Sequence, residues 1–248
     1  MIKKISQEIT NCMLFSTQRI VECFGVTYDP EEKSYMIVMN YLGINLQKYL
    51  KSSQLTFKNK FGLLAGITSG LNSIHKKKAV HKDFHPGNIL IKRHEDGKIY
   101  SYLVDLGLCR KIDEIDNEKV YGVLPYIAPE VLRGSEHTQA SDIYSFGIVA
   151  YELFSGSSPY DERTDYRNLQ SEITSQKFRP NLNRAQAPQL LKELIAKCWE
   201  DDPELRPTSA KLEKIILQWA GEIGCFDSYY INKNSKFYGQ CREMEKEE

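Results

Sequence analysis

The sequence predicts an α+β fold in which short strands accompany a mostly helical region. Two pairs of short runs, rich in β-branched and aromatic residues, occur within the first 104 residues. Most of the other segments carry apolar residues at three- and four-residue steps, the pattern of amphipathic helices. With 248 residues, of which 41% are hydrophobic, the chain is long enough for one large domain or two closely packed lobes.

The two pairs of strand-like runs are each predicted to form a hairpin. The first pair covers residues 20–28 and 34–41, joined by a turn that contains proline. The second pair covers residues 88–92 and 100–104, separated by a short polar segment.

Four helices are expected from the apolar spacing. The first covers about residues 57–78, the second runs from Ser141, which can cap it, to Phe154, and the third covers residues 188–199. The fourth is expected to begin at Pro207 and to bury one face. That face consists of Leu212, Ile215, Ile216 and Trp219.

The composition limits which binding partners and which cellular location are expected. Lysine plus arginine equal aspartate plus glutamate at 33 each, so no global field attracts nucleic acid or an anionic membrane. The first 15 residues lack the apolar stretch of a signal peptide, and no later run is long enough to span a bilayer. Six scattered cysteines predict free thiols rather than a zinc site or a disulfide framework. A cytoplasmic protein is expected.

The most informative polar pattern is HKDFHPGN at residues 81–88. Asp83 and Asn88 stand five residues apart immediately before a predicted strand, and Asp105 follows the partner strand in the sequence Asp-Leu-Gly. Because the two arms of a hairpin bring these ends together, the three side chains are expected at a common edge. Two oxygen ligands beside a third carboxylate suit magnesium and phosphates.

These motifs resemble those of eukaryotic-type protein kinases. HKDFHPGN is similar to the HRDxxxxN catalytic loop, and Asp-Leu-Gly is similar to the DFG motif. Ala-Pro-Glu at 128–130 and SDIYSFG at 141–147 follow in the family's order. The run from Cys198-Trp199 to Arg206-Pro207-Thr208 resembles the closing signature of the tyrosine-kinase-like group. The resemblance covers about residues 1–220 and implies a protein-kinase-like fold.

Three parts are implied by the resemblance. Residues 1–42 would form a partial N-lobe with a helix, two strands and the hinge, which is a remnant of the N-lobe sheet. Residues 43–220 would form the mostly helical C-lobe. Residues 221–248 are polar and aperiodic and are expected to form a tail that is poorly ordered in part.

The resemblance also implies phosphoryl transfer from ATP to a protein hydroxyl. Asp83 would accept the proton of the attacking hydroxyl, and Asn88 and Asp105 would hold the magnesium ions. Glu130 and Arg206 would form a structural ion pair. The expected cofactors are therefore ATP and Mg²⁺, and the expected partner is a protein substrate, with the oligomeric state left open.

Adenine contacts are implied at the hinge. Met39 stands at the gatekeeper position, so Asn40 and Leu42 would offer backbone groups to adenine. Leu90 would pack beneath the base.

Histidines divide into two expected environments. His81 is expected to be a packed core residue rather than an acid or base. His75, His94 and His137 are expected at exposed loops or helix ends.

One departure from the family pattern concerns the glycine-rich loop and the VAIK-type lysine, neither of which occurs in this sequence. The chain is expected to be a fragment or the result of a shortened gene model. Glu8 matches the helix glutamate that usually pairs with that lysine and is expected to be a solvated carboxylate. Loss of one charge-stabilising donor costs on the order of a hundredfold in rate. The alternative is therefore a pseudokinase or scaffold without phosphoryl transfer.

The activation segment departs from the pattern as well. Between Asp105 and Glu130 there is no serine or threonine, and the only phosphorylatable hydroxyls belong to Tyr121 and Tyr126. Lys82 replaces the arginine that often binds an activating phosphate, and lysine is a poorer bidentate clamp. Serine or threonine phosphorylation in this segment is not expected to switch the protein on.

Acceptor identity and enzyme class leave further alternatives. Serine/threonine kinases usually carry lysine and threonine where this chain has His85 and Val123, although the tyrosine-kinase-like motifs favour serine or threonine as the acceptor. Small-molecule phosphotransferases of the aminoglycoside and choline kinase type share an HxDxHxxN loop. They lack the Ala-Pro-Glu segment and the Arg-Pro-Thr closing motif.

Overall fold

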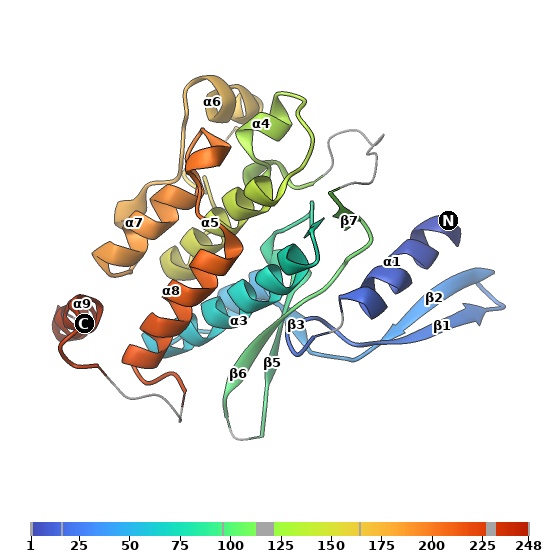
Figure 1. Ribbon diagram of the computed structural model, residues 1–248, viewed down its shortest axis with the longest axis horizontal. Helices are drawn as coiled ribbons and strands as arrows, with labels where there is room; N and C mark the ends of the chain where they lie inside the picture. Colours follow the sequence, from blue (N-terminus) through green and yellow to red (C-terminus); the bar gives the residue numbers. More distant parts are fainter. Residues whose placement is uncertain are drawn as a thin grey trace.

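A computed structural model describes residues 2–15, 17–95, 97–112, 122–163, 165–226 and 232–247. Figure 1 shows a small part, drawn in blue and formed by one helix and a hairpin, beside a larger and mostly helical part. The mixture of small sheets and many helices confirms the predicted α+β class. None of the helices in the described ranges combines the length and apolarity that a membrane span requires.

The small part contains α1 (Ile2–Leu14), β1 (Cys23–Asp29) and β2 (Ser34–Met39). The two strands pair antiparallel with Val26 opposite Ile37, so the predicted first hairpin is confirmed. The Asp29 side chain accepts a hydrogen bond from the Glu31 amide at 2.9 Å, which closes the turn.

A second sheet joins the small part to the larger one. Its strand order is β3 (Ile44–Asn45), β5 (Ile89–Arg93) and β6 (Ile99–Leu103), and all its pairs are antiparallel. Gly43, just before β3, has φ +93°, and a Cβ there would lie 2.9 Å from the Ile91 carbonyl oxygen. Only glycine allows this close approach of the chain to β5. The predicted second hairpin is confirmed.

Helix α3 (Phe57–Lys76) is the long helix predicted over residues 57–78, and Thr56 caps it by accepting from the Asn59 amide at 3.2 Å. It packs closely on β6. A Cβ at Gly66 would lie 2.4 Å from Ser101 Oγ, so the glycine is what allows the helix backbone to reach the strand.

Helix α5 (Gln139–Ser155) forms the centre of the larger part, and its residues from 141 to 154 are all buried. It begins three residues earlier than expected. Thr138, not Ser141, is the cap residue, and Ser141 completes the capping box by accepting from the Thr138 amide at 3.0 Å. The expectation that Ser141 begins the helix is therefore wrong, because a serine at the third helical position can also bond back to the cap.

The remaining elements surround α3 and α5. They are α2 (Leu46–Ser52), β4 (Ala79–Val80), η1 (Pro86–Asn88), β7 (Arg110–Lys111), η2 (Leu124–Tyr126), α4 (Pro129–Leu132), α6 (Leu169–Ser175), η3 (Leu182–Arg184), α7 (Gln189–Cys198), η4 (Pro203–Leu205), α8 (Ser209–Glu222) and α9 (Lys236–Glu247).

Helices α7 and α8 confirm the last two predicted helices, with a shift at the start of α8. Thr208 caps α8 by accepting from the Lys211 amide at 3.3 Å, so Pro207 precedes the helix. Leu212 and Ile216 are buried as expected, whereas Ile215 and Trp219 are only partly buried.

The polar tail expected after residue 220 instead contains helix α9, which packs on the core. The rings of Trp219 and Phe237 stack with their centroids 4.5 Å apart, and Phe61 contacts Phe237 edge-on at 5.2 Å. Gln240 Oε1 accepts from the Leu190 amide at 3.0 Å. Phe237 and Cys241, four residues apart, form a narrow apolar face that a mostly polar sequence conceals.

We expect Phe237→Ala to lower the free energy of unfolding by about 3 kcal/mol, because it removes a buried ring that contacts two aromatic partners. Urea denaturation measures the change. Lys236→Ala, at an exposed position of the same helix, is the control. Equal stability of the two variants would contradict the packing of α9 on the core.

Candidate active site

Asp142 on α5 anchors the HKDFHPGN loop. Its carboxylate is 1% exposed and accepts hydrogen bonds from the backbone amides of His81 at 2.7 Å and Lys82 at 3.0 Å. His75 Nε2 lies 2.9 Å from the same carboxylate. Burial raises the pKa of Asp142, but the hydrogen bonds and charges of His75 and His81 outweigh it and hold the pKa below its usual range.

His75 was expected at an exposed helix end, and that expectation is wrong. The side chain is buried because α3 ends against α5, where Asp142 supplies its partner. His81 is confirmed as a core residue: it is fully buried, burial lowers its pKa, and its ring contacts Phe84 edge-on at 5.5 Å.

Two backbone amide bonds to Asp142 hold the loop in a conformation that costs energy. Lys82 has φ +71°, a backbone conformation that residues other than glycine rarely adopt. Asp83 follows this turn at Lys82, and its side chain is half-buried.

Asp83 and Asn88 are bonded to each other across the loop. Asn88 Nδ2 donates to the Asp83 carbonyl oxygen at 2.9 Å and to Asp83 Oδ2 at 3.1 Å. Among the described residues no donor reaches Asn88 Oδ1, so this oxygen is available for another ligand. The loop thus presents a carboxylate and an amide oxygen side by side.

Asp105 reaches the same edge from the other arm of the hairpin. The Val104 amide donates to the Asn88 carbonyl oxygen at 3.0 Å. Asp105 is the next residue, so its backbone lies close to Asn88. Asp105 is exposed and has φ +56°, and its Oδ1 accepts from the Gly107 amide at 3.4 Å. The predicted meeting of Asp83, Asn88 and Asp105 at one edge therefore agrees with the strand register.

The oxygen set is open rather than a closed metal cage. In the ranges that the structure describes, no three His, Cys, Asp or Glu side chains come close enough to hold an ion. Magnesium commonly takes one or two protein carboxylates and completes its octahedron with water and phosphate oxygens. One carboxylate from Asp105 and the free oxygen of Asn88 fit this kind of site.

Helix α1 contributes two residues to the same region. A Cβ at Gly107 would lie 3.3 Å from Asp105 Oδ1 and 3.5 Å from Glu8 Oε2, so the two carboxylates converge there. Burial, and then the charge of Asp105, raise the pKa of Glu8. Glu8 is half-buried, so the expectation of a solvated carboxylate is wrong.

Asn11 is a residue that the sequence reasoning missed. It is 3% exposed, and its Nδ2 donates to the carbonyl oxygens of Leu106 at 2.7 Å and Cys109 at 2.9 Å. It ties α1 to the segment after Asp105. Its position between Glu8 and Phe15 on one face of the helix was the available signal.

The hinge residues lie next to the second sheet. The Asn40 amide donates to the Glu22 carbonyl oxygen at 2.9 Å, so this donor is used within the first hairpin. Leu42 is 4% exposed, and Leu90 lies opposite Asn45 in the β3–β5 pairing. The adenine contacts of Asn40, Leu42 and Leu90 stay a prediction.

Tyr126, one of the two tyrosines expected to be phosphorylatable, is buried. Its hydroxyl donates to Glu152 Oε2 at 2.5 Å, and burial followed by the charge of Glu152 raises its pKa. Tyr121 lies outside the described residues. Burial raises the pKa of Glu152 to about 7, since the Tyr126 hydrogen bond only partly offsets the cost of burying the charge.

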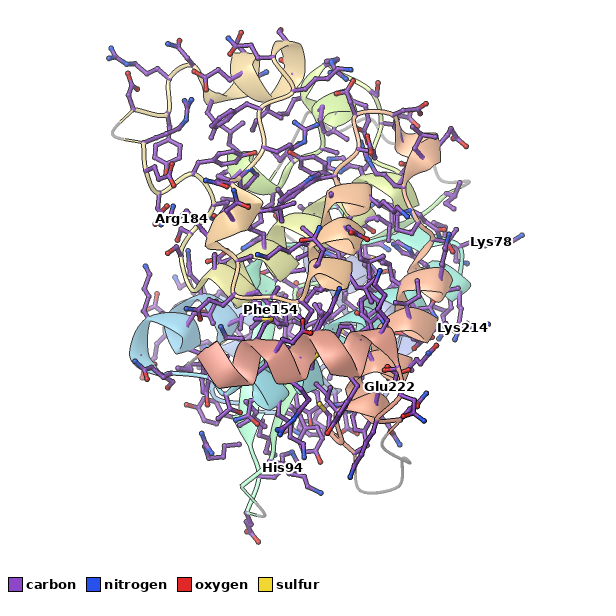
Figure 2. The ribbon with its side chains drawn as sticks, turned by 90° about the vertical axis from the view of Figure 1, so that its left-hand side faces the viewer. Lys78, His94, Phe154, Arg184, Lys214 and Glu222 are labelled. Carbon is purple, nitrogen blue, oxygen red and sulfur yellow. The ribbon has the colours of Figure 1, made fainter. Side chains whose placement is uncertain are left out.

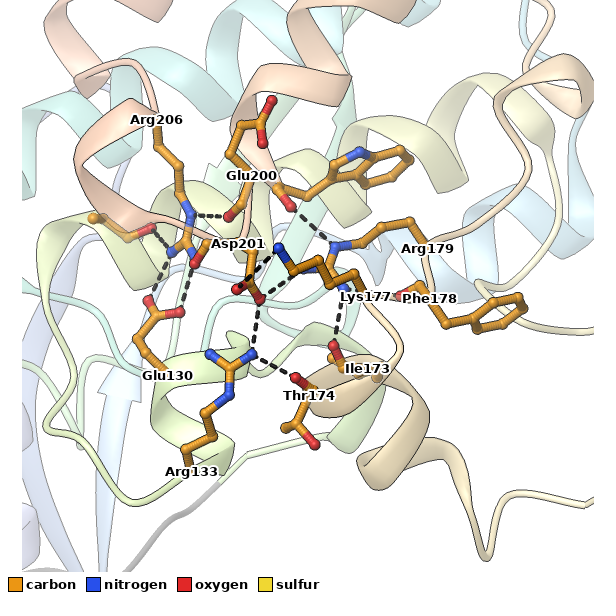
Figure 3. Close-up of polar contacts among 12 residues, drawn as sticks. Glu130, Arg133, Ile173, Thr174, Lys177, Phe178, Arg179, Glu200, Asp201 and Arg206 are labelled. Atoms are coloured by element: carbon orange, nitrogen blue, oxygen red, sulfur yellow. Dashed lines mark hydrogen bonds and ion pairs between the residues drawn. The ribbon is translucent and has the colours of Figure 1, made fainter.

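Glu130 and Arg206 form the structural ion pair that was expected, as Figure 3 shows. Nη1 and Nη2 of Arg206 lie 2.7 Å and 2.8 Å from the two carboxylate oxygens. The same guanidinium donates to the carbonyl oxygens of Glu200 and Ala140. A buried bidentate pair of this kind fixes the start of α8 against α4 and α5.

The fold and this loop define the class of protein. A helical lobe that holds the HKDFHPGN loop beside an Asp-Leu-Gly segment is typical of protein kinases. Residues 1–216 match the family model described as protein tyrosine and serine/threonine kinase. The chain therefore belongs to the protein kinase family, whose members use ATP and Mg²⁺.

Individual relatives agree with this assignment. "Probable serine/threonine-protein kinase roco8" of Dictyostelium discoideum is 31% identical over 87% of this chain, and "Probable serine/threonine-protein kinase PkwA" of Thermomonospora curvata is 32% identical over 80%. "Serine/threonine-protein kinase STY17" of Arabidopsis thaliana is 26% identical over 90%. The matches span 12%, 25% and 39% of these three relatives respectively.

We expect Asp142→Asn to lower the free energy of unfolding by about 1–3 kcal/mol, because an amide offers one acceptor oxygen where the carboxylate offers two. Hydrogen exchange at the His81 and Lys82 amides should become faster. Asp165→Asn, which alters an exposed ion pair, is the control. Unchanged exchange at both amides would contradict the anchoring role.

Titration of Glu152 should affect stability between about pH 4.5 and pH 7. Because the folded-state pKa is raised, folding favours the protonated carboxyl. Stability is therefore highest below the unfolded pKa of 4.5 and falls as the pH rises to about 7.

We expect the unfolding free energy of the wild type to fall, relative to Glu152→Gln, by up to about 1.4 kcal/mol per pH unit within this window. Denaturation at a series of pH values measures the difference. Parallel profiles for the two proteins would contradict it.

Proposed function

We propose that this chain is a kinase catalytic domain that transfers the γ-phosphoryl group of ATP to a serine or threonine hydroxyl of a protein substrate. The observation that supports the proposal is the bonding of Asn88 Nδ2 to Asp83, which leaves Asn88 Oδ1 available. The backbone bond from Val104 to Asn88 brings the start of the Asp-Leu-Gly segment to the same edge. The names of the similar proteins, which are serine/threonine-protein kinases, support the choice of acceptor.

Asp83 is the proposed acceptor of the proton from the substrate hydroxyl. His85 Nδ1 accepts from the Gly87 amide at 3.1 Å, which assigns the proton of the neutral ring to Nε2. Nε2 lies 3.6 Å from Asp83 Oδ1. The nearby His85 lowers the pKa of Asp83, with the Asn88 hydrogen bond as a smaller cause, so the carboxylate is ionised and ready to accept a proton.

Asn88 and Asp105 are the proposed magnesium ligands. Bound magnesium would neutralise charge on the phosphate oxygens as the phosphoryl group moves. The chain's own contribution is to hold the two ligand oxygens in place: Asn88 through its bonds to Asp83, and Asp105 through the turn that follows β6. Little reorganisation is then needed when the nucleotide binds.

The nucleotide base is proposed to lie at the hinge. The carbonyl of Asn40 and the backbone of Leu42 would bond to adenine, and Leu90 would pack against its face. Six free cysteines support a cytoplasmic location for the reaction.

A scaffold without phosphoryl transfer is the second candidate. In the described part of the chain no cation pairs with Glu8, and the carboxylate faces Asp105 instead. Two carboxylates that converge without a positive partner repel a phosphate placed between them. A scaffold that transfers no phosphate is expected to have such an arrangement.

A nucleotide titration separates the two candidates. We expect ATP with magnesium to raise the melting temperature of the wild type, and Asp105→Ala to abolish this shift because a magnesium ligand is lost. Asp83→Asn should keep the shift but slow phosphorylation of a peptide library by about 10²–10⁴-fold.

Libraries with serine, threonine or tyrosine as the sole acceptor identify the substrate hydroxyl. Glu243→Gln, at an exposed position of α9, is the control for charge loss. A wild-type melting temperature that ignores ATP would favour the scaffold over the enzyme.

A further inference from the structure

A cavity of about 540 Å³ lies between the start of α3, the start of β6 and the chain that follows α8. Figures 1 and 2 place the β5–β6 hairpin, whose tip carries His94, and the end of α8, marked by Glu222, at the same end of the molecule. None of Asp83, Asn88 and Asp105 lines it, so the cavity is separate from the candidate active site.

The lining is positively charged and partly aromatic. Arg19, Lys58 and Lys98 supply cationic groups, and Tyr100 and Phe226 supply rings. The described residues of the lining include no aspartate or glutamate. Cationic residues that gather in one cavity of a chain with zero net charge are a local feature that composition alone does not reveal.

Arg19 is held in position without an acidic partner. Its guanidinium lies over the Tyr100 ring, 5.0 Å from the centroid, and a Cβ at Gly66 would lie 3.6 Å from its Nη1. The residue is half-buried, and among the described residues no carboxylate forms an ion pair with it. This guanidinium is partly desolvated and fixed by stacking on the ring. It can therefore bind an anion through two parallel hydrogen bonds.

The start of α3 adds to the positive potential. This helix has no acidic residue in its first turn, and Lys58 occupies that turn although the helix dipole disfavours a cation there. Cys225 Sγ donates to the Lys58 carbonyl oxygen at 3.3 Å, which joins the helix start to the chain after α8. An anion in the cavity would offset the charges of Arg19 and Lys58 and the positive end of the helix dipole.

We propose that this cavity binds a small phosphate-bearing molecule. Arg19 binds the phosphate group with its planar fork, Lys58 contributes a second charge, and the Phe226 ring forms an apolar wall. The volume lies within the range of small-molecule sites in proteins. A condensed inorganic phosphate and a phosphorylated polyol share this chemistry, and separate titrations distinguish them.

Calorimetric titration of the full chain with pyrophosphate, and separately with inositol hexakisphosphate, tests the site. Magnesium is omitted so that the candidate active site does not take up phosphate. Salt at about 0.15 M screens charges beyond about 8 Å. We expect one saturable site for at least one probe, and Lys58→Glu to weaken binding by about tenfold or more. Arg19→Gln should have a similar effect.

Two controls make the result decisive. Lys214→Glu makes the same charge change at an exposed position of α8 that does not line the cavity, and it should leave affinity within about twofold. Asp105→Ala should also leave it unchanged. The proposal is overturned if the wild type binds neither probe at about 1 mM, if Lys214→Glu weakens binding as much as Lys58→Glu, or if Asp105→Ala removes binding.

Discussion

One buried carboxylate, that of Asp142, determines how the rest of the site is arranged. It accepts from two consecutive loop amides and from His75, so it connects α5, the end of α3 and the HKDFHPGN loop at a single point. A carboxylate that is almost fully buried is stable there only because each bond compensates part of its lost hydration. The same bonds hold Lys82 at positive φ, and the direction of Asp83 follows from that conformation.

Two further anchors surround this point. The Glu130–Arg206 pair fixes α4 against the start of α8, and Asn11 fixes the segment after Asp105 to α1. Both ends of the activation segment are thus attached to helices by buried polar contacts. A loop can then hold functional groups at its surface while its ends stay in place, because the bonds at the ends restrict the conformations available to it.

Local patterns were enough for most elements and for the candidate loop. The hairpins, α3, α7 and α8 follow from apolar spacing and turn residues. The choice of Asp83, Asn88 and Asp105 as candidate site residues follows from motif spacing and hairpin geometry. His75, Glu8 and Asn11 were misjudged or missed, because their burial depends on helices far away in the sequence. Helix α9 was missed for a similar reason: Trp219 and Phe61, which cover Phe237, lie outside its own segment.

The sequence by itself determined the class of fold, the order of the elements and the set of oxygen-bearing residues, since strand and helix periodicity and motif spacing are local properties of the chain. Only the tertiary structure decided which polar side chains are buried and with what partner: Asp142 with His75, Glu8 beside Asp105, Tyr126 with Glu152, and Arg19 over Tyr100. The physical reason is that desolvation and pairing depend on distances between segments that are remote in sequence, and these distances are set by how the helices pack.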